Sequence, residues 1–177
     1  MTTQRPFQVS GKAWLIKDKT GNWIDNIDTD MIFHNQHLHI TEVPKMGPHA
    51  FGNLEGWEDF PERCGQGDIL IVGKNFGAGS SRQQAVDCFR ALGVSVIIAE
   101  SFGAIYKRNA INSGMPILEA PGLTEWLKET EIAKAEAHFE TGELTLDGTT
   151  HQIKPMSDIQ GKIYAAGDLF AYGRQMA

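Results

Sequence analysis

The middle of this chain alternates short apolar runs with helix-like segments, and no other feature of the sequence restricts the fold as strongly. The apolar runs lie at 68–73, 94–99 and 116–119. The segment 81–92 carries apolar residues at the i, i+3, i+4 and i+7 positions of one helical face, and 102–111 follows as a second helix-like segment. Strand, helix, strand, helix, strand is typical of βαβ units with a parallel sheet, so the sequence predicts an α/β fold.

The two ends of the chain add smaller expected elements. An amino-terminal strand at 12–17 precedes a turn at 20–22. In the tail, Thr-Gly at 141–142 and Asp-Gly at 147–148 are typical of hairpin turns, which predicts small antiparallel strands. The remaining expected elements are a helix at 124–130, strands at 137–140, 143–146 and 149–153, and a last helix at 157–176 that is interrupted by Gly161, Gly167 and Gly173.

The segment 25–63 has little periodicity and an unusual composition. It holds four of the six histidines and three of the seven prolines. We expect a long irregular excursion with a helical turn near 55–60. Because loops of this length in compact domains are more often functional than idle, we expect a functional role for this excursion, and 28–63 is predicted to be a mobile lid.

Length and charge exclude several function classes. A chain of 177 residues with a formal charge of −6 corresponds to one domain, and it has no cluster of Lys and Arg. A duplex nucleic-acid binder or a protein of anionic membrane surfaces needs such cations. No apolar leader and no apolar stretch of roughly 18 residues is present, so we expect no membrane partner and a cytoplasmic location.

The cysteine content restricts disulfide and metal chemistry. Cys64 and Cys88 are the two cysteines of the chain, and we expect both to be free thiols. Iron–sulfur clusters take three or four thiolate ligands, so this chain alone is not expected to hold one. The sequence therefore predicts no metal and no cofactor on this chain.

The segment 73–82, Gly-Lys-Asn-Phe-Gly-Ala-Gly-Ser-Ser-Arg, joins the first apolar run to the following helix and is the strongest candidate for a binding site. Such turns lie where open α/β sheets bind ligands, and the next helix offers unpaired N–H groups to an anion. Ser80, Ser81 and Arg82 would supply hydroxyls and a planar cation. In the alternative interpretation, Ser80 is a helix N-cap and Arg82 a solvated charge. The order of Lys74 and the glycines does not match a P-loop, and Arg82 stands where a Rossmann motif requires glycine.

The excursion contains further polar candidates. Asp28 and Asp30 flank a threonine and could cap a helix, close an Asx turn or bind a cation. His37 and His39 would share one face of a strand and could form a metal pair, although loop histidines, including His34, are more often surface or packing residues. Ser80, a loop histidine and Asp30 could nominally form a hydrolase triad, but G-x-S-x-G is absent. A serine hydrolase and a non-catalytic anion-binding domain therefore remain as alternatives.

Four motifs in order resemble the swivelling domain of the aconitase superfamily over about residues 11–120. The segment 77–85 resembles G-x-G-S-S-R-E-H-A, 28–32 resembles D-T-D-x-I, 98–102 resembles I-A-x-S-F, and 108–114 resembles R-N-x-x-N-x-G. The resemblance implies a single β/β/α swivelling domain over 1–177. Its expected parts are a mostly parallel central sheet with flanking helices, small additional antiparallel strands, the irregular loop at 28–63 and a carboxyl-terminal hairpin and helix at 134–177.

The resemblance also implies a function and roles for individual residues. Ser80 would be the alkoxide base that removes or returns a carbon-bound proton, and Ser81 and Arg82 would hold a substrate carboxylate. Asp30 and Gly79 would belong to the same binding site. The family's [4Fe-4S] cluster lies on a separate large subunit, so a heterodimer or heterotetramer is expected.

The implied reaction is the reversible dehydration of a small hydroxy di-acid. The 3-isopropylmalate dehydratase reaction of leucine biosynthesis is the first expectation. Homoaconitase, dimethylmalate dehydratase and aconitase-like small subunits are the alternatives.

The chain also departs from the family pattern. Gln83 and Gln84 replace the usual Glu-His pair, and Ala78 stands where Cys or Glu is common. The specificity loop reads His37, Leu38, His39, Ile40, and no arginine occurs between Arg5 and Arg63. The missing loop arginine disfavours citrate as the substrate. Leu38 and Ile40 could face a branched alkyl group or belong to the core.

Overall fold

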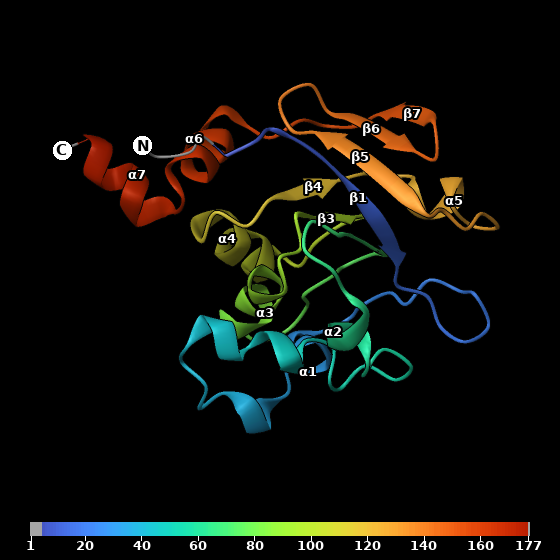
Figure 1. Ribbon diagram of the computed structural model, residues 1–177, viewed down its shortest axis with the longest axis horizontal. Helices are drawn as coiled ribbons and strands as arrows, with labels where there is room; N and C mark the ends of the chain where they lie inside the picture. Colours follow the sequence, from blue (N-terminus) through green and yellow to red (C-terminus); the bar gives the residue numbers. More distant parts are fainter. Residues whose placement is uncertain (1–4, 177) are drawn as a thin grey trace.

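The computed structural model describes residues 5–176, in which seven strands form one curled sheet (Figure 1). Its strand order is β4-β3-β2-β1-β5-β6-β7. Neighbouring strands are parallel from β1 to β4 and antiparallel from β1 through β5 to β7. The strands are β1 Gln8–Leu15, β2 Ile69–Val72, β3 Val96–Ala99, β4 Ile117–Glu119, β5 Lys134–His138, β6 Glu143–Leu146 and β7 Thr149–Gln152. The α/β prediction is confirmed, and the antiparallel half is as large as the parallel half.

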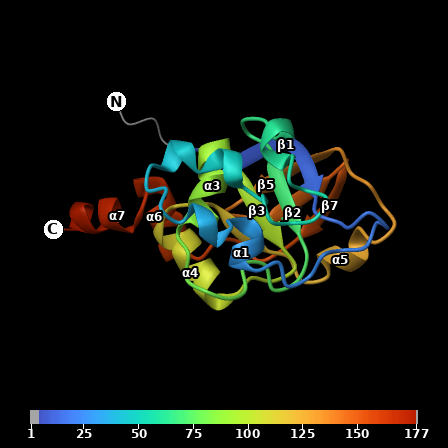
Figure 2. The ribbon, with the colours of Figure 1, turned by 90° about the horizontal axis from the view of Figure 1, so that it is seen from below.

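Helices cover one face of the parallel strands. α3 (Gln84–Leu92) follows β2, and α4 (Ala104–Asn112) follows β3. Figure 2, seen from below, shows these two helices and α1 (Thr29–Ile32) in front of the sheet. The other helical segments are the 3₁₀ turns Asn35–His37, Val43–Lys45 and Gly47–His49, and the helices α2 Phe60–Arg63, α5 Leu123–Trp126, α6 Asp158–Ala166 and α7 Leu169–Met176. Within the described residues, no helix is both long and apolar enough to cross a bilayer.

Two apolar cores lie on opposite faces of the parallel strands. In β2, Leu70 and Val72 belong to the core beneath α3 and α4, while Ile69 and Ile71 belong to the other core. The second core includes side chains of β5 and β6, because the antiparallel half curls over the parallel half (Figure 1). Burial on both faces explains why the central strands are continuous apolar runs rather than alternating patterns.

Strand β1 is longer at its start than the sequence predicted. It begins at Gln8 rather than residue 12 and pairs with both β2 and β5. Gly11 is required within it, because a Cβ atom there would lie 2.2 Å from the carbonyl oxygen of Gly67. The first part of this strand was not predicted, because glycine is normally unfavourable in strand interiors.

The inner part of the excursion belongs to the first core. Phe33, Phe51 and Phe60 are fully buried, and the Phe51 N–H donates to Ile32 O over 2.8 Å. Phe51 holds a left-handed backbone with φ of +59°, which is costly for a bulky residue and requires support from its surroundings. The predicted mobility of 28–63 remains a prediction.

Several predicted boundaries are wrong. The helical turn expected at 55–60 begins at Phe60, where Pro61 fits the first turn of α2. Helix α3 begins three residues later than predicted, β5 begins three residues earlier, and α5 ends at Trp126. Among the tail glycines, Gly167 separates α6 from α7, whereas Gly161 and Gly173 lie inside these helices.

Candidate active site

The loop at 73–83 crosses the segment 25–29, which brings the two strongest sequence motifs together. The Gly77 N–H donates to Ile27 O over 2.8 Å, and the Thr29 N–H donates to Ala78 O over 2.9 Å. Thr29 Oγ1 also donates to Ser80 O over 3.0 Å. Backbone contacts between segments about 50 residues apart therefore fix the loop that carries the two serines.

Two glycines shape this loop for different reasons. Gly77 has φ of +76°, and a Cβ atom there would lie 2.1 Å from Tyr106 Cγ on α4. Gly79 has φ of +93°, and a Cβ atom there would make only ordinary contacts, 3.8 Å from Asp28 Cβ and Thr29 Oγ1. Gly77 is thus required for close packing against α4, and Gly79 for the left-handed turn before Ser80.

The first acid of the Asp-Thr-Asp motif has a structural role. Asp28 is the N-cap of α1, and its Oδ1 accepts hydrogen bonds from the backbone N–H groups of Asp30 and Met31 at 2.9 Å and 2.8 Å. Of the three roles considered for this acid pair, Asp28 performs two, because it caps α1 and closes an Asx turn with the Asp30 N–H. The cap orients the second acid, Asp30, toward the loop.

Asp30 and Arg82 form the central ion pair of the site. Arg82 Nη1 lies 2.6 Å from Asp30 Oδ1 and also donates to Phe33 O over 3.1 Å. The hydrogen bond from Arg82 is the main cause that holds the pKa of Asp30 below its usual value. Asn53 Nδ2 donates to Asp30 Oδ2 over 3.1 Å. In the described part of the chain, Nε and Nη2 of Arg82 have no partner, so they are available to a carboxylate ligand.

Ser80 and Ser81 are exposed at the surface of the loop. Asn109 Nδ2 on α4 donates to Ser81 Oγ over 3.1 Å, whereas within residues 5–176 no hydrogen bond involves Ser80 Oγ. The interpretation of Ser80 as an N-cap is wrong, because α3 begins at Gln84 and its N-cap is Gln83. We expected the helix to begin directly after Ser80. Its amino terminus lies about one turn further along the chain.

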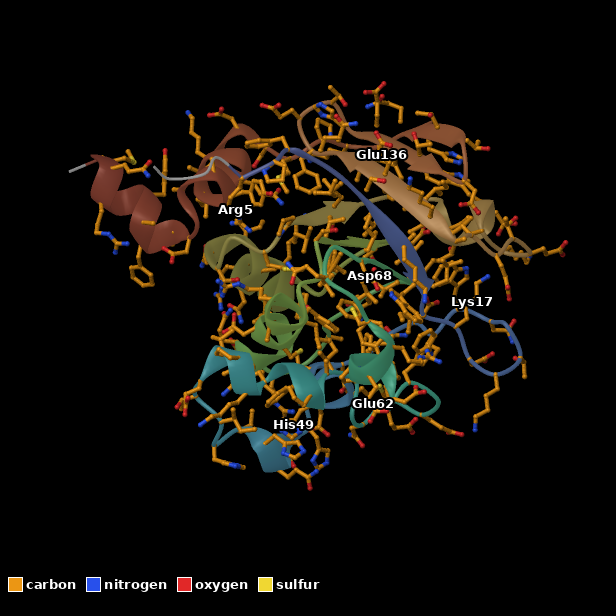
Figure 3. All side chains as sticks on the ribbon, viewed as in Figure 1. Arg5, Lys17, His49, Glu62, Asp68 and Glu136 are labelled. Atoms are coloured by element: carbon orange, nitrogen blue, oxygen red, sulfur yellow. The ribbon has the colours of Figure 1, made fainter. Side chains whose placement is uncertain are left out.

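The specificity loop starts at the last residue of the 3₁₀ turn Asn35–His37 and continues as a turn and irregular backbone rather than the expected strand. The His37 ring stacks on His49 with centroids 3.9 Å apart and meets the Phe33 ring at an edge. Burial and the neighbouring His49 lower the pKa of His37. His49, labelled in Figure 3, lies in the outer part of the excursion.

The two aliphatic residues of this loop have different environments. Ile40 packs against the first core, whereas Leu38 is 37% exposed. Gln84 Nε2 donates to Leu38 O over 3.3 Å, which places the loop beside the start of α3. His39 Nδ1 lies 3.1 Å from Gln36 O. Leu38 is thus the aliphatic side chain of this loop that can contact a ligand.

The structure does not support the metal and hydrolase alternatives. Among residues 5–176, no group of three or more His, Cys, Asp or Glu is arranged to hold a metal ion. Burial raises the pKa of the Cys64 thiol to about 12, so this cysteine is a poor ligand at neutral pH. Asp30 is paired with Arg82, and its distance of 4.0 Å to His34 Nε2 is too long for a triad hydrogen bond.

Sequence reasoning did not identify Asn53 and Asn109 as members of the site. Asn109 lies in the Arg-Asn motif at 108–114, so a signal existed, but nothing in the sequence showed which residue it contacts. Asn53 lies in the irregular excursion and carries no recognisable pattern. Both reach the site through tertiary contacts, Asn109 across 28 residues and Asn53 across 23.

Comparisons with known proteins show what the chain as a whole is similar to. The family model described as the aconitase C-terminal domain matches residues 11–122. The 3-isopropylmalate dehydratase small subunit of Metallosphaera sedula is 35% identical over 86% of this chain and 92% of its own length. That of Lachnospira eligens is 35% identical over 94% of both chains. The crystal structure of 3-isopropylmalate dehydratase from Methanocaldococcus jannaschii has a TM-score of 0.80, with 28% identity over 96% of this chain and 95% of that one.

Proposed function

This chain belongs to the aconitase C-terminal domain family, among the 3-isopropylmalate dehydratase small subunits, and we propose that it supplies the proton-transferring half of a hydro-lyase active site. One observation carries the proposal. Ser80, Ser81 and Arg82 are consecutive on one loop, and Asp30 of α1 pairs with Arg82, so two exposed hydroxyls directly precede a guanidinium with free N–H groups. This combination suits an anionic substrate that must lose a proton.

Each residue of the site has a separate role in the proposed reaction. Arg82 and Ser81 bind a carboxylate of the substrate, and Asp30 keeps the guanidinium in place. Ser80 as an alkoxide takes the carbon-bound proton, and the C–H electron pair becomes the new C=C bond as the neighbouring C–O bond breaks. In the reverse direction, Ser80 returns the proton to one carbon while hydroxide adds to the neighbouring carbon, so the sum is the addition of one water to the double bond. Gly79 gives the substrate close access to the loop backbone.

A partner must complete the site. A [4Fe-4S] cluster on the large subunit would supply the Lewis-acid activation of the departing hydroxyl group when bound. The exposed serines would be covered in a heterodimer or heterotetramer, where exclusion of water strengthens the contacts of Arg82.

The side chains near the loop favour a branched hydroxy di-acid. Leu38 is an exposed aliphatic side chain beside α3, and residues 6–62 contain no arginine that could bind a third carboxylate. We therefore assign 3-isopropylmalate as the substrate, which places the reaction in leucine biosynthesis. Homocitrate, dimethylmalate and citrate are the competing substrates, and a cytoplasmic location remains a prediction.

Reconstitution tests this function. The purified chain is mixed with a large subunit whose cluster has been rebuilt anaerobically, and the absorbance of the unsaturated acid is followed with each of the four substrates. We expect activity on 3-isopropylmalate from the mixture and none from either chain alone. A mixture that is inactive on all four acids would overturn the proposal, and turnover of citrate or homocitrate would overturn the substrate assignment.

A further inference from the structure

Asn109 on α4 contacts the site from outside the loop that carries the serines. Its Nδ2 donates to Ser81 Oγ over 3.1 Å, and its side chain is half-buried. We propose that Asn109 is a positioning residue for the substrate carboxylate and acts through Ser81. The inference deepens the proposed function and rests on it.

The polarity of this hydrogen bond sets the direction of the Ser81 hydroxyl. An amide nitrogen only donates, so Ser81 Oγ accepts from Asn109 and keeps its own O–H for another acceptor. A carboxylate oxygen is an acceptor only, and it is therefore the matching ligand. Asn109 does for Ser81 what Asp30 does for Arg82: each fixes one carboxylate-binding group before the substrate arrives.

Helix α4 holds this donor rigidly. Tyr106 and Asn109 are three residues apart, so they lie on one face of the helix. The Tyr106 ring packs at Gly77, where a Cβ atom would lie 2.1 Å from its Cγ, and its hydroxyl donates to Ala85 O over 3.1 Å. Tyr106 thus fixes the loop before the serines, and Asn109 fixes it at Ser81. A group on a packed helix is placed more precisely than a group on a loop.

Kinetics of the complex with the large subunit test the inference. Asn109→Ala is expected to raise KM for 3-isopropylmalate about 3- to 10-fold, with kcat changed less than about 2-fold, because one hydrogen bond is lost in binding. Asn112→Ala is the matched control. Asn112 ends the same helix, and no hydrogen bond of its side chain occurs in the described range, so KM should stay unchanged.

A double-mutant cycle separates positioning from a general structural role. In a Ser81→Ala background, Asn109→Ala should add less than about 2-fold to KM, because the group through which it acts is gone. Asn109→Asp keeps the shape of the side chain but reverses its polarity, and it should raise KM more than Asn109→Ala does. Unchanged KM in Asn109→Ala, or the same increase with and without Ser81, would overturn the inference. An inactive wild-type complex would overturn the proposed function and this inference together. An active wild-type complex with either of these two results would overturn this inference alone.

Discussion

At the residue scale, the site is built on polar groups that are already paired with each other. The Nη1 of Arg82 is held by Asp30 and by Phe33 O, and both carboxylate oxygens of Asp30 accept a further hydrogen bond, from Asn35 N and from Asn53 Nδ2. Arg82 is 16% exposed in its side chain, so it loses little freedom when a ligand binds. Asp30 and Phe33 O therefore hold the guanidinium in a fixed orientation before any ligand binds.

The role of Ser80 leads to the most direct prediction for activity. Ser80→Ala should lower kcat of the complex about 100- to 10,000-fold, which is the usual loss when a proton-transfer group is removed. The side chain is exposed, so the free energy of unfolding should change by less than about 0.5 kcal/mol. Steady-state kinetics and urea denaturation measure the two effects. Full activity of this variant would exclude Ser80 as the base.

Arg82 should act mainly in binding. Arg82→Lys replaces a planar fork by a point charge, and we expect KM to rise about 10-fold while kcat falls less. Steady-state kinetics of the complex measure KM and kcat of this variant under the same conditions as for Ser80→Ala. A loss confined to kcat would instead place Arg82 in the chemical step.

The ion pair also predicts a pH dependence of stability. The pKa of Asp30 is lowered in the folded chain, so its stabilising contribution is present above the unfolded value of about 4 and is lost as pH falls through the folded value. The difference in unfolding free energy between wild type and Asp30→Asn should be constant at pH 6–7 and shrink below about pH 4. Glu55→Gln removes an open surface pair with Lys19 and should differ little from wild type at any pH. A constant difference down to pH 2 for Asp30→Asn would contradict this account.

The loop serines and Arg82 could be named from the sequence because they are consecutive in a glycine-rich turn. Asp30 could be named from its motif, although its partner was unknown. Asn53 and Asn109 could not be assigned a role, because their contacts depend on where the excursion and α4 pack. The role of a residue could thus be predicted where the residues that define its motif lie close to it along the chain.

At the element scale, the contact between the loop and α4 predicts an unequal effect of two similar substitutions. Gly77 and Gly148 both have positive φ, at +76° and +90°, but a Cβ atom would clash with Tyr106 at Gly77 and would meet nothing within 4 Å at Gly148. Gly148→Ala should therefore cost only backbone strain of about 1 kcal/mol. Gly77→Ala should cost roughly 3 kcal/mol or more, because α4 must move. Urea denaturation of the two variants compares the costs, and equal losses would contradict the packing role of Gly77.

The regular elements were largely predictable, since β2, β3, α3 and α4 each carry a strong local pattern. The errors fall where tertiary contacts override that pattern. Gly11 lies in a strand because Gly67 packs against it, and α3 begins late because the residues before Gln84 are held by Thr29 and Asp30. His37 and His39 were predicted to share a strand face, whereas His37 stacks on His49, which lies twelve residues further along the chain.

At the scale of the whole molecule, the excursion and the sheet should unfold together. Phe51 packs against Phe60 and Phe89, with ring centroids 5.3 Å and 5.0 Å apart, so it joins the excursion to α3. Phe51→Ala should lower the free energy of unfolding by about 3–5 kcal/mol while keeping a single transition. Ile159→Ala removes a side chain that is 51% exposed and serves as the control, with an expected change below about 1 kcal/mol. A second, separate transition in the Phe51 variant would show that the excursion is an independent unit.

Because β1 lies at the centre of the sheet, the chain can be truncated only at certain positions without loss of the fold. The family model ends at residue 122, but β5, which pairs with β1 from Gln8 to Lys12, begins only at Lys134. A polypeptide that stopped at 122 would leave a row of backbone N–H and C=O groups on β1 without partners and would open the second core to water. Such a fragment should associate edge to edge rather than remain monomeric. The region shared across the family is therefore smaller than the unit that must be expressed, and fusions or truncations of this chain should keep the antiparallel strands through Gln152.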